Sequence, residues 1–382
     1  MSSSDRFFVN SSETLRTVDA HQELLASLDR ITTYNPPVHT CSTGWKFQGF
    51  YSGPTSVAYL FYRLSQIFPD LEFKQQSLFD WAEAYLALSP RVQKAPDCRH
   101  YGIADETFAR WALTAVMERD LNQVRHICQY EPVINAEDNR DGSDEWLYGR
   151  AGYLYLLRLC RTFVDAEAAT SGVATLLRSA IENTVARILA SPQPWAWHGK
   201  RCLGAAHGAA GILCQLVLSR PSAAPRLHGP LARLLDAQLA SGNFPPSAGS
   251  ASDALVQFCH GAPGVRVALR SLAPHFPVLK HTVDEAAARA AEDVWRRGVL
   301  TKTPCLCHGV AGNALALDAD EARFLQFLSF MGTEAMEKGG WLRDAGRGDE
   351  FVGLFTGEAG RAWAWAVAAG RGERVVIGFN DL

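Results

Sequence analysis

Glycine turns recur about every fifty residues along this chain, and this repeat constrains the fold more than any other feature. Five of them share the pattern Gly-x-x-Gly, at 149–152, 208–211, 261–264, 309–312 and 357–360. Two weaker copies precede them, at 51–54 and at 101–105, and the second of these lacks its second glycine. With positions 53 and 105 aligned to the second glycines, the steps range from 47 residues (105 to 152) to 59 residues (152 to 211). A period of this length is typical of a repeat built from one helix hairpin.

Apolar segments with helical character follow the turns, as at 153–159, 212–218 and 363–369. More polar, amphipathic stretches such as 284–295 lie between them and indicate surface helices with one apolar stripe. Seven hairpins can form an open solenoid or a closed ring. Because the segments after the turns are apolar nearly all round, they favour burial inside a ring. The sequence therefore predicts an all-α protein, an α/α toroid of about seven helix hairpins with inner and outer helical rings.

The repeat also sets the domain organisation. A length of 382 residues would by itself suggest two or three domains. A ring of repeats overrides that expectation, since each hairpin packs on its neighbours. We expect one domain over residues 1–382, in which residues 1–40 form an N-terminal arm and the first helix.

Charge and cysteine content exclude several classes of protein. With 37 Lys and Arg against 40 Asp and Glu, and no basic block, nothing attracts nucleic acid. No run of 18 apolar residues predicts a transmembrane segment, and the first ten residues lack the apolar run of a signal peptide. Nine cysteines, an odd number in a long chain, indicate reduced thiols rather than a disulfide framework. We expect a cytoplasmic protein and a monomer.

Two consecutive turns begin with Cys-His-Gly, at 259–261 and at 307–309. Thiolate and imidazole are zinc ligands, and a closed ring would place these turns side by side. Cys259, Cys307 and His308 then supply three ligands, which leaves a position for water or substrate and favours a catalytic site. Cys305 is an alternative ligand. A buried free cysteine is otherwise a small hydrophobe, and this is the interpretation we favour for Cys41, Cys98, Cys128, Cys160 and Cys214.

Essentially end to end, the chain resembles the lanthionine synthetase C-like family, and in particular its eukaryotic, glutathione-binding type. Besides the two Cys-His-Gly turns, the segments that carry the resemblance are 145–153 (EWLYGRAGY), 197–208 (WHGKRCLGAAHG), 241–246 (SGNFPP) and 353–360 (GLFTGEAG). The resemblance implies an α/α toroid with zinc on Cys259, Cys307 and His308. It also implies an enzyme that forms thioether bonds by adding glutathione thiolate to an electrophile. The implied electrophile is dehydroalanine or dehydrobutyrine in a peptide or protein, or another small electrophile.

Addition of a thiolate to such an alkene produces an enolate, which needs a general acid. His207, in the turn of the preceding repeat, is our candidate; a purely structural histidine is the alternative. His260, beside a predicted ligand, either assists or hydrogen-bonds its own turn. Glu145 matches an acidic position of the family, and either orients a histidine, takes part in proton transfer, or is an exposed carboxylate at a helix start.

Glutathione carries two carboxylates, which call for cationic partners. By resemblance, Lys302 and Arg6 match cationic positions of the glutathione-binding members, and Arg347 is a looser match. A solvated surface charge is the alternative for each. Departures from the family pattern are the degenerate second turn, Cys202 at an aromatic position, and Thr356 at a usually acidic position, which puts substrate details in doubt.

Other functions compete with a glutathione transferase. The first is a glutathione-binding zinc adaptor or redox sensor without turnover. A zinc hydrolase ranks lower, because two thiolates make the metal a poorer Lewis acid. Glycoside hydrolases, which also occur as α/α toroids, need paired carboxylates, and the turns of this chain offer Cys and His instead.

Overall fold

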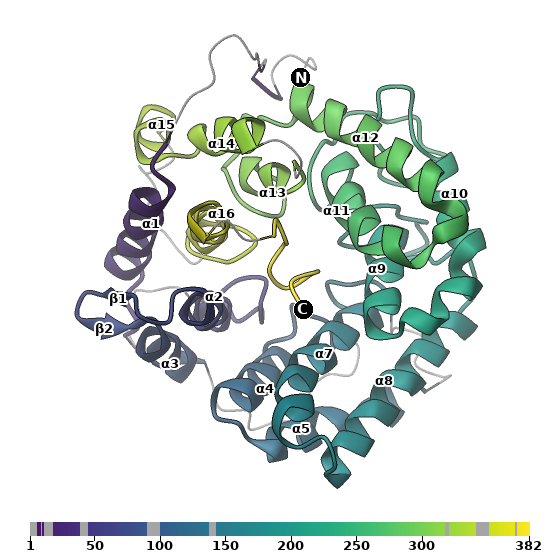
Figure 1. Ribbon diagram of the computed structural model, residues 1–382, viewed down its shortest axis with the longest axis horizontal. Coiled ribbons are helices and arrows are strands. Elements are labelled where there is room, and N and C mark those ends of the chain that lie inside the picture. Colours follow the sequence, from purple (N-terminus) through teal and green to yellow (C-terminus); the bar gives the residue numbers. More distant parts are fainter. Residues whose placement is uncertain are drawn as a thin grey trace.

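The computed structural model describes residues 6–8, 10, 18–38, 45–89, 100–136, 143–317, 321–340, 351–370 and 373–382. Helices dominate, and they form two concentric rings around a common centre (Figure 1). The predicted all-α toroid is therefore confirmed. No helix in the described ranges is both long enough and apolar enough to span a membrane.

The inner ring consists of helices that each begin at a glycine or aspartate turn. In chain order they are α2 (Pro54–Ile67), α4 (Glu106–Met117), α7 (Arg150–Glu167), α9 (Ala209–Ser219), α11 (Ala262–Leu272), α13 (Val310–Leu315) and α16 (Glu358–Gly370). In α9, nine of eleven residues are buried. Such all-round burial is expected of helices enclosed between a central core and an outer layer.

The outer ring contains α1 (Ala20–Tyr34), α3 (Leu78–Leu88), α5 (Leu121–Cys128), α8 (Gly172–Ala190), α10 (His228–Asp236), α12 (Lys280–Arg297) and α14 (Glu321–Ser329). In α12, six of eighteen residues are buried, and they form one stripe that includes Val283, Ala286 and Ala290. This matches the expected surface helix at 284–295. Contacts of α16 with both α1 and α2 close the ring between the two ends of the chain.

Short elements complete the outline. They are a two-stranded antiparallel hairpin of β1 (Glu72–Phe73) and β2 (Gln76–Ser77), the helices α6 (Glu131–Ile134) and α15 (Thr333–Lys338), and the 3₁₀ turns Pro221–Leu227, Ala273–His275 and Pro277–Leu279. All of them lie between the longer helices in the chain.

Backbone hydrogen bonds join the seven turns into a closed circle at one end of the toroid. Each turn donates an N–H to a carbonyl of a neighbouring turn. The bonds are Phe355 N to Tyr51 O (2.9 Å), Cys307 N to Phe355 O (2.9 Å), Cys259 N to Cys307 O (3.0 Å), Ala206 N to Cys259 O (3.4 Å), Trp146 N to Ala206 O (3.2 Å), Ala104 N to Leu147 O (3.0 Å) and Phe50 N to Ile103 O (2.8 Å). Turns far apart in sequence are thereby held at fixed spacing.

The second glycine of each complete turn allows the first turn of its helix to pack on a backbone carbonyl. A Cβ at Gly264 would lie 1.9 Å from Phe258 O, and a Cβ at Gly312 would lie 2.0 Å from Leu306 O. No side chain fits there. Gly53 and Asp105 instead occupy the N-cap position of their helices, which belongs to the first glycine in later turns. Their alignment with the second glycines was therefore wrong.

The C-terminal segment enters the centre of the ring (Figure 1). Gly378 O accepts a hydrogen bond from Trp146 Nε1 at 3.0 Å, which places the segment beneath the circle of turns. Phe379 packs edge-on against Trp146 and Phe258, with ring centroids 5.3 Å and 5.2 Å away. The core under the turns is thus aromatic and contains a chain end as well as helices.

Candidate functional site

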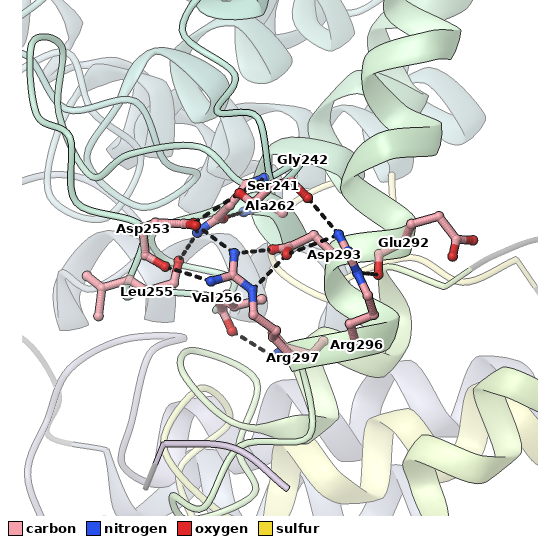
Figure 2. A network of polar contacts seen from close by, with 12 residues as sticks. Ser241, Gly242, Asp253, Leu255, Val256, Ala262, Glu292, Asp293, Arg296 and Arg297 are labelled. Carbon is pink, nitrogen blue, oxygen red and sulfur yellow. Dashed lines mark hydrogen bonds and ion pairs between the residues drawn. The ribbon is translucent and has the colours of Figure 1, made fainter. Parts of the chain in front are cut away.

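The loop that leads into the fifth turn is fixed to α12 by a polar network (Figure 2). Arg297 donates to Asp253 and to Asp293, each at 2.7 Å. Asn243 donates to Asp253 Oδ1 at 3.0 Å and accepts from the backbone N–H of Ala262, the first residue of α11, at 2.7 Å. This network gives a structural role to the segment 241–246, and it fixes the turn that carries Cys259.

Cys259 and Cys307 come from adjacent turns and form a buried thiol pair. Their side chains are 8% and 7% exposed. The hydrogen bond with Cys307 lowers the pKa of Cys259, and the same bond raises the pKa of Cys307. The pair can therefore share one proton, with the negative charge favoured on Cys259. The ring closure has brought together two of the three predicted metal ligands.

His308 hydrogen-bonds the Cys307 thiol, which opposes the upward shift of the Cys307 pKa. All three predicted ligands are thus connected. Within the described ranges, however, no group of three or more His, Cys, Asp or Glu side chains stands in an arrangement that would hold a metal ion. The predicted ligand set remains a prediction.

The remaining cysteines of the described residues are buried as well. Burial raises the pKa of Cys305 to about 12, and its role as an alternative ligand stays a prediction. Cys128, Cys160 and Cys214 are at most 2% exposed, as expected of small hydrophobic residues. Cys41 and Cys98 lie outside the described residues.

Two contacts to the thiol pair were missed by sequence reasoning. Tyr51 donates from Oη to Cys307 Sγ at 3.4 Å, and burial raises the pKa of Tyr51. Gln257 donates from Nε2 to Cys259 Sγ at 3.0 Å. The position of Tyr51 in the first glycine turn was the one available signal, because a closed ring of turns faces its members toward a common centre.

Glu145 and His207 form the second part of the site. Glu145 Oε2 lies 2.8 Å from His207 Nδ1, and their side chains are 1% and 14% exposed. The carboxylate also accepts the backbone N–H groups of Leu147 at 2.9 Å and Tyr148 at 2.6 Å. Because the carboxylate is the acceptor in all these bonds, the Nδ1 of His207 carries the proton and Nε2 is left for other partners. Glu145 is therefore a buried orienting group and not an exposed carboxylate.

An aromatic stack covers one face of His207. The Trp197 ring lies parallel to it, with centroids 3.9 Å apart and an interplanar angle of 3°. On another side, the His260 ring centroid is 6.0 Å away. Burial lowers the pKa of His260, and His207 adds to this effect, so His260 is a neutral imidazole at pH 7. Its buried Nδ1 is among the described atoms without a hydrogen-bond partner.

Of the three cationic residues predicted to bind glutathione, Arg6 and Lys302 lie on neighbouring segments. Arg6 O accepts the backbone N–H of Thr301 at 3.0 Å, which places the N-terminal segment beside Lys302. Lys302 Nζ is engaged with Gln257 Oε1 at 3.0 Å. Arg347 lies outside the described residues. Thr356 faces Ser52 across the junction of the last and first turns, with hydroxyl oxygens 3.4 Å apart.

The chemistry of this donor set fits zinc. Two hydrogen-bonded thiols and an imidazole in contact with one of them supply sulfur and nitrogen ligands, which zinc prefers. The hydrogen bonds from Gln257 and Tyr51 are of the kind that orient metal-binding thiolates.

Known proteins are similar to this chain in sequence and in fold. Glutathione S-transferase LANCL1 of Danio rerio is 30% identical over 309 residues, which cover 76% of this chain and 72% of the relative. LanC-like protein GCL1 of Arabidopsis thaliana is 33% identical over 247 residues, which cover 58% of this chain and 54% of the relative. Among solved structures, nisin cyclase has the same fold, with a TM-score of 0.55 at 13% identity, over 93% of this chain and 94% of its own.

The family model of lanthionine synthetase C-like proteins matches residues 44–368. That stretch contains every glycine turn from Gly53 to Gly360, and with them the thiol pair and the Glu145–His207 pair. By the extent of this match, the chain belongs to the lanthionine synthetase C-like family.

Proposed function

We propose that this protein is a zinc-dependent transferase that forms a thioether bond, by adding the thiolate of glutathione to a dehydroalanine or dehydrobutyrine residue. The observation that carries the proposal is the convergence of the buried Cys259–Cys307 pair and the Glu145–His207 pair at the circle of turns. The name of the Danio rerio relative, a glutathione S-transferase, supports glutathione as the thiol.

Cys259, Cys307 and His308 would hold the zinc ion. Zinc in such a site supplies stabilisation of a thiolate over a thiol, so that a nucleophilic sulfur exists at neutral pH. The low exposure of the two cysteines excludes bulk water from that side of the site. The chain's own contribution here is to fix the ligands through the backbone bond between Cys259 N and Cys307 O.

The reaction is an addition of S–H across a carbon–carbon double bond. The glutathione sulfur supplies the electron pair for the new bond to the β-carbon, and the electrons of the double bond move toward the carbonyl as an enolate. A proton must then reach the α-carbon. His207 would take up the proton lost by the thiol at Nε2, directly or through His260, and deliver it to the α-carbon, because Glu145 already holds the proton on Nδ1. Neutral His260, whose ring centroid is 6.0 Å from that of His207, would receive or relay the proton lost by the thiol.

Glutathione binding is assigned to the cationic edge formed by Arg6 and Lys302, which adjoin through the bond from Thr301 N to Arg6 O. Their charges suit the two carboxylates of glutathione. Arg347 remains a predicted third contact. A cytoplasmic location and a monomeric state likewise stay predictions.

Incubation of the purified protein with glutathione and a dehydroalanine peptide tests the proposal. We expect the peptide to gain the mass of glutathione, at a rate that Cys307→Ala reduces to the uncatalysed background. The control is Cys128→Ala, which removes a buried thiol remote from the turns.

The competing function is a zinc adaptor or redox sensor that binds glutathione without turnover. The direct contact of the Cys259 and Cys307 thiols is the observation that favours it, because such a pair can respond to oxidation. Retained glutathione binding together with peptide of unchanged mass would select the sensor and contradict the transferase.

A further inference from the structure

Gln257 connects a surface cation to the sulfur of a predicted metal ligand. Its side chain is 7% exposed. Lys302 Nζ lies 3.0 Å from Oε1, and Nε2 lies 3.0 Å from Cys259 Sγ. An ammonium group can only donate, so the amide oxygen must face Lys302 and the amide N–H must face the sulfur. The orientation of the amide is therefore determined by its two neighbours.

This arrangement already engages Lys302, the residue whose predicted role is to bind a glutathione carboxylate. A positive charge on the amide oxygen polarises the amide and strengthens the hydrogen bond that its N–H donates. A stronger bond to sulfur stabilises negative charge there and orients the sulfur lone pairs. Loss of contacts of this kind typically weakens metal binding.

We propose that Gln257 is a positioning residue for Cys259, and that Lys302 acts through Gln257 on the metal-binding sulfur. The presence of the metal is part of the proposed function, and this inference rests on it. The contacts among Lys302, Gln257 and Cys259 are independent of the metal. It assigns Lys302 a role in the metal site in addition to any contact with glutathione.

The turn that carries Cys259 does not depend on the Gln257 side chain. The backbone N–H of Gln257 donates to His260 O at 3.2 Å, and Cys259 N donates to Cys307 O at 3.0 Å. Substitutions of the side chain therefore leave these backbone bonds in place. Met matches Gln in length and cannot hydrogen-bond as the amide does. Glu keeps an acceptor for Lys302 but, when ionised, has no proton to donate to sulfur.

The test measures transfer of Zn²⁺ from the full-length protein to a coloured chelator, for the parent, Gln257→Met, Gln257→Glu, Lys302→Met and the double variant. We expect Gln257→Met and Gln257→Glu to release the metal about 10-fold more readily. Lys302→Met has a smaller effect, and adds nothing when combined with Gln257→Met. In the Co²⁺-loaded protein, the sulfur-to-cobalt absorption band shifts in the same variants.

A matched control is Gln215→Met. Gln215 is likewise a buried glutamine, which accepts from Arg158 at 2.7 Å and donates to Phe379 O at 2.8 Å, and it lies away from the thiol pair. We expect this variant to lose stability without a change in metal transfer. Equal metal transfer by Gln215→Met and Gln257→Met would show a general packing effect and overturn the inference.

A readout without metal separates this inference from the proposed function. In the ¹⁵N-labelled protein, Lys302→Met should shift the side-chain amide resonance of Gln257. An unmoved resonance, or a Lys302→Met variant that keeps its metal and loses only glutathione affinity, refutes the relay even where the transferase stands. A shifted resonance in a protein that forms no glutathione adduct would keep the relay and reject the transferase.

Discussion

At the scale of single residues, the site depends on side chains that fix one another. Glu145 accepts from His207 and from two backbone N–H groups, so it holds the ring and its own turn together. Trp197 stacks on one face of the His207 ring and restricts its rotation. An imidazole held on its edge and on its face can present Nε2 in one direction only, which suits a proton donor.

Replacement of His207 tests its role as general acid. His207→Gln removes the titrating ring while it keeps a polar side chain of similar length. Since general acid catalysis contributes about 10²-fold or more, we expect adduct formation to fall at least that far, with glutathione affinity within about twofold by titration calorimetry. The exposed carboxylate variant Glu118→Gln serves as an unaffected control. A rate within a few-fold of the parent would make His207 a structural residue.

The amino-acid pattern allowed part of this site to be predicted. The repeated Cys-His-Gly triplets identified Cys259 and Cys307 as neighbours, since equivalent positions of adjacent repeats must meet in a ring. Gln257 and Trp197 could not be found in the same way. Their side chains reach the site from irregular turns, where direction depends on tertiary packing and not on a periodicity of 3.6 or 2 residues.

At the scale of elements, close backbone contact sets the position of each inner helix. The second glycine of a turn lets the helix start against a carbonyl six residues earlier, as Gly264 does against Phe258 O. Ion pairs then fix one helix to another. Glu358, at the start of α16, pairs with Arg361 of the same helix and with Arg30 of α1. Both kinds of contact lie close to the circle of turns.

Gly264→Ala should destabilise the protein strongly. The added Cβ would lie 1.9 Å from Phe258 O, so the turn beside Cys259 must shift. We expect a loss of about 2 kcal/mol or more in the free energy of unfolding, measured in urea. Gly172→Ala, at the start of α8 with nothing within 4 Å of the new Cβ, is the matched control. It should leave stability unchanged or raise it by up to about 1 kcal/mol. Similar losses in both variants would contradict the close-contact explanation.

Acid should weaken the link between α1 and α16. Burial alone would raise the pKa of Glu358, but Arg361 and Arg30 outweigh it and lower this pKa to about 2. An unfolded glutamate titrates at about 4.3. The depressed pKa therefore stabilises the folded state above about pH 4.3, and this stability is lost as the pH falls toward 2.

The parent protein should thus lose about 1.5 kcal/mol more than Glu358→Gln between pH 5 and pH 3. Urea unfolding of both proteins at both pH values measures this difference. The other carboxylates are the same in the two proteins, so their contributions cancel. At pH 7 the variant is less stable by about 3–5 kcal/mol, because two buried guanidinium groups lose their shared partner. Parallel pH profiles in the two proteins would rule out a role for the Glu358 titration.

At the scale of the whole molecule, the circle of turns and the C-terminal segment hold the ring together. The segment reaches the centre, where the buried Asp381 pairs with Arg63 and accepts from Tyr155 at 2.9 Å and Tyr59 at 3.3 Å. Gln215 donates to Phe379 O. Helices α2, α7 and α9 are therefore tied to one segment. The repeat pattern predicted the ring but not what fills it, because the central segment is not part of any repeat.

Asp381→Ala should weaken the entire toroid. It leaves Arg63, whose side chain is 14% exposed, without its carboxylate. We expect a loss of about 3 kcal/mol and a single urea transition that coincides by tryptophan fluorescence and circular dichroism, as predicted for one domain. The exposed pair of Lys280 and Asp284 offers a control, since Asp284→Ala should cost less than about 1 kcal/mol. Separate transitions for different parts of the chain would contradict the single-domain prediction.

We propose that ring closure brings Cys259, Cys307 and His308 together to hold zinc. Elemental analysis of the purified full-length protein, beside Cys259→Ala and the control Cys128→Ala, tests it most directly. We predict one zinc per chain in the parent and in Cys128→Ala, and far less than one in Cys259→Ala. Stoichiometric zinc in Cys259→Ala, or a parent that binds none at equal zinc supply, would contradict the claim.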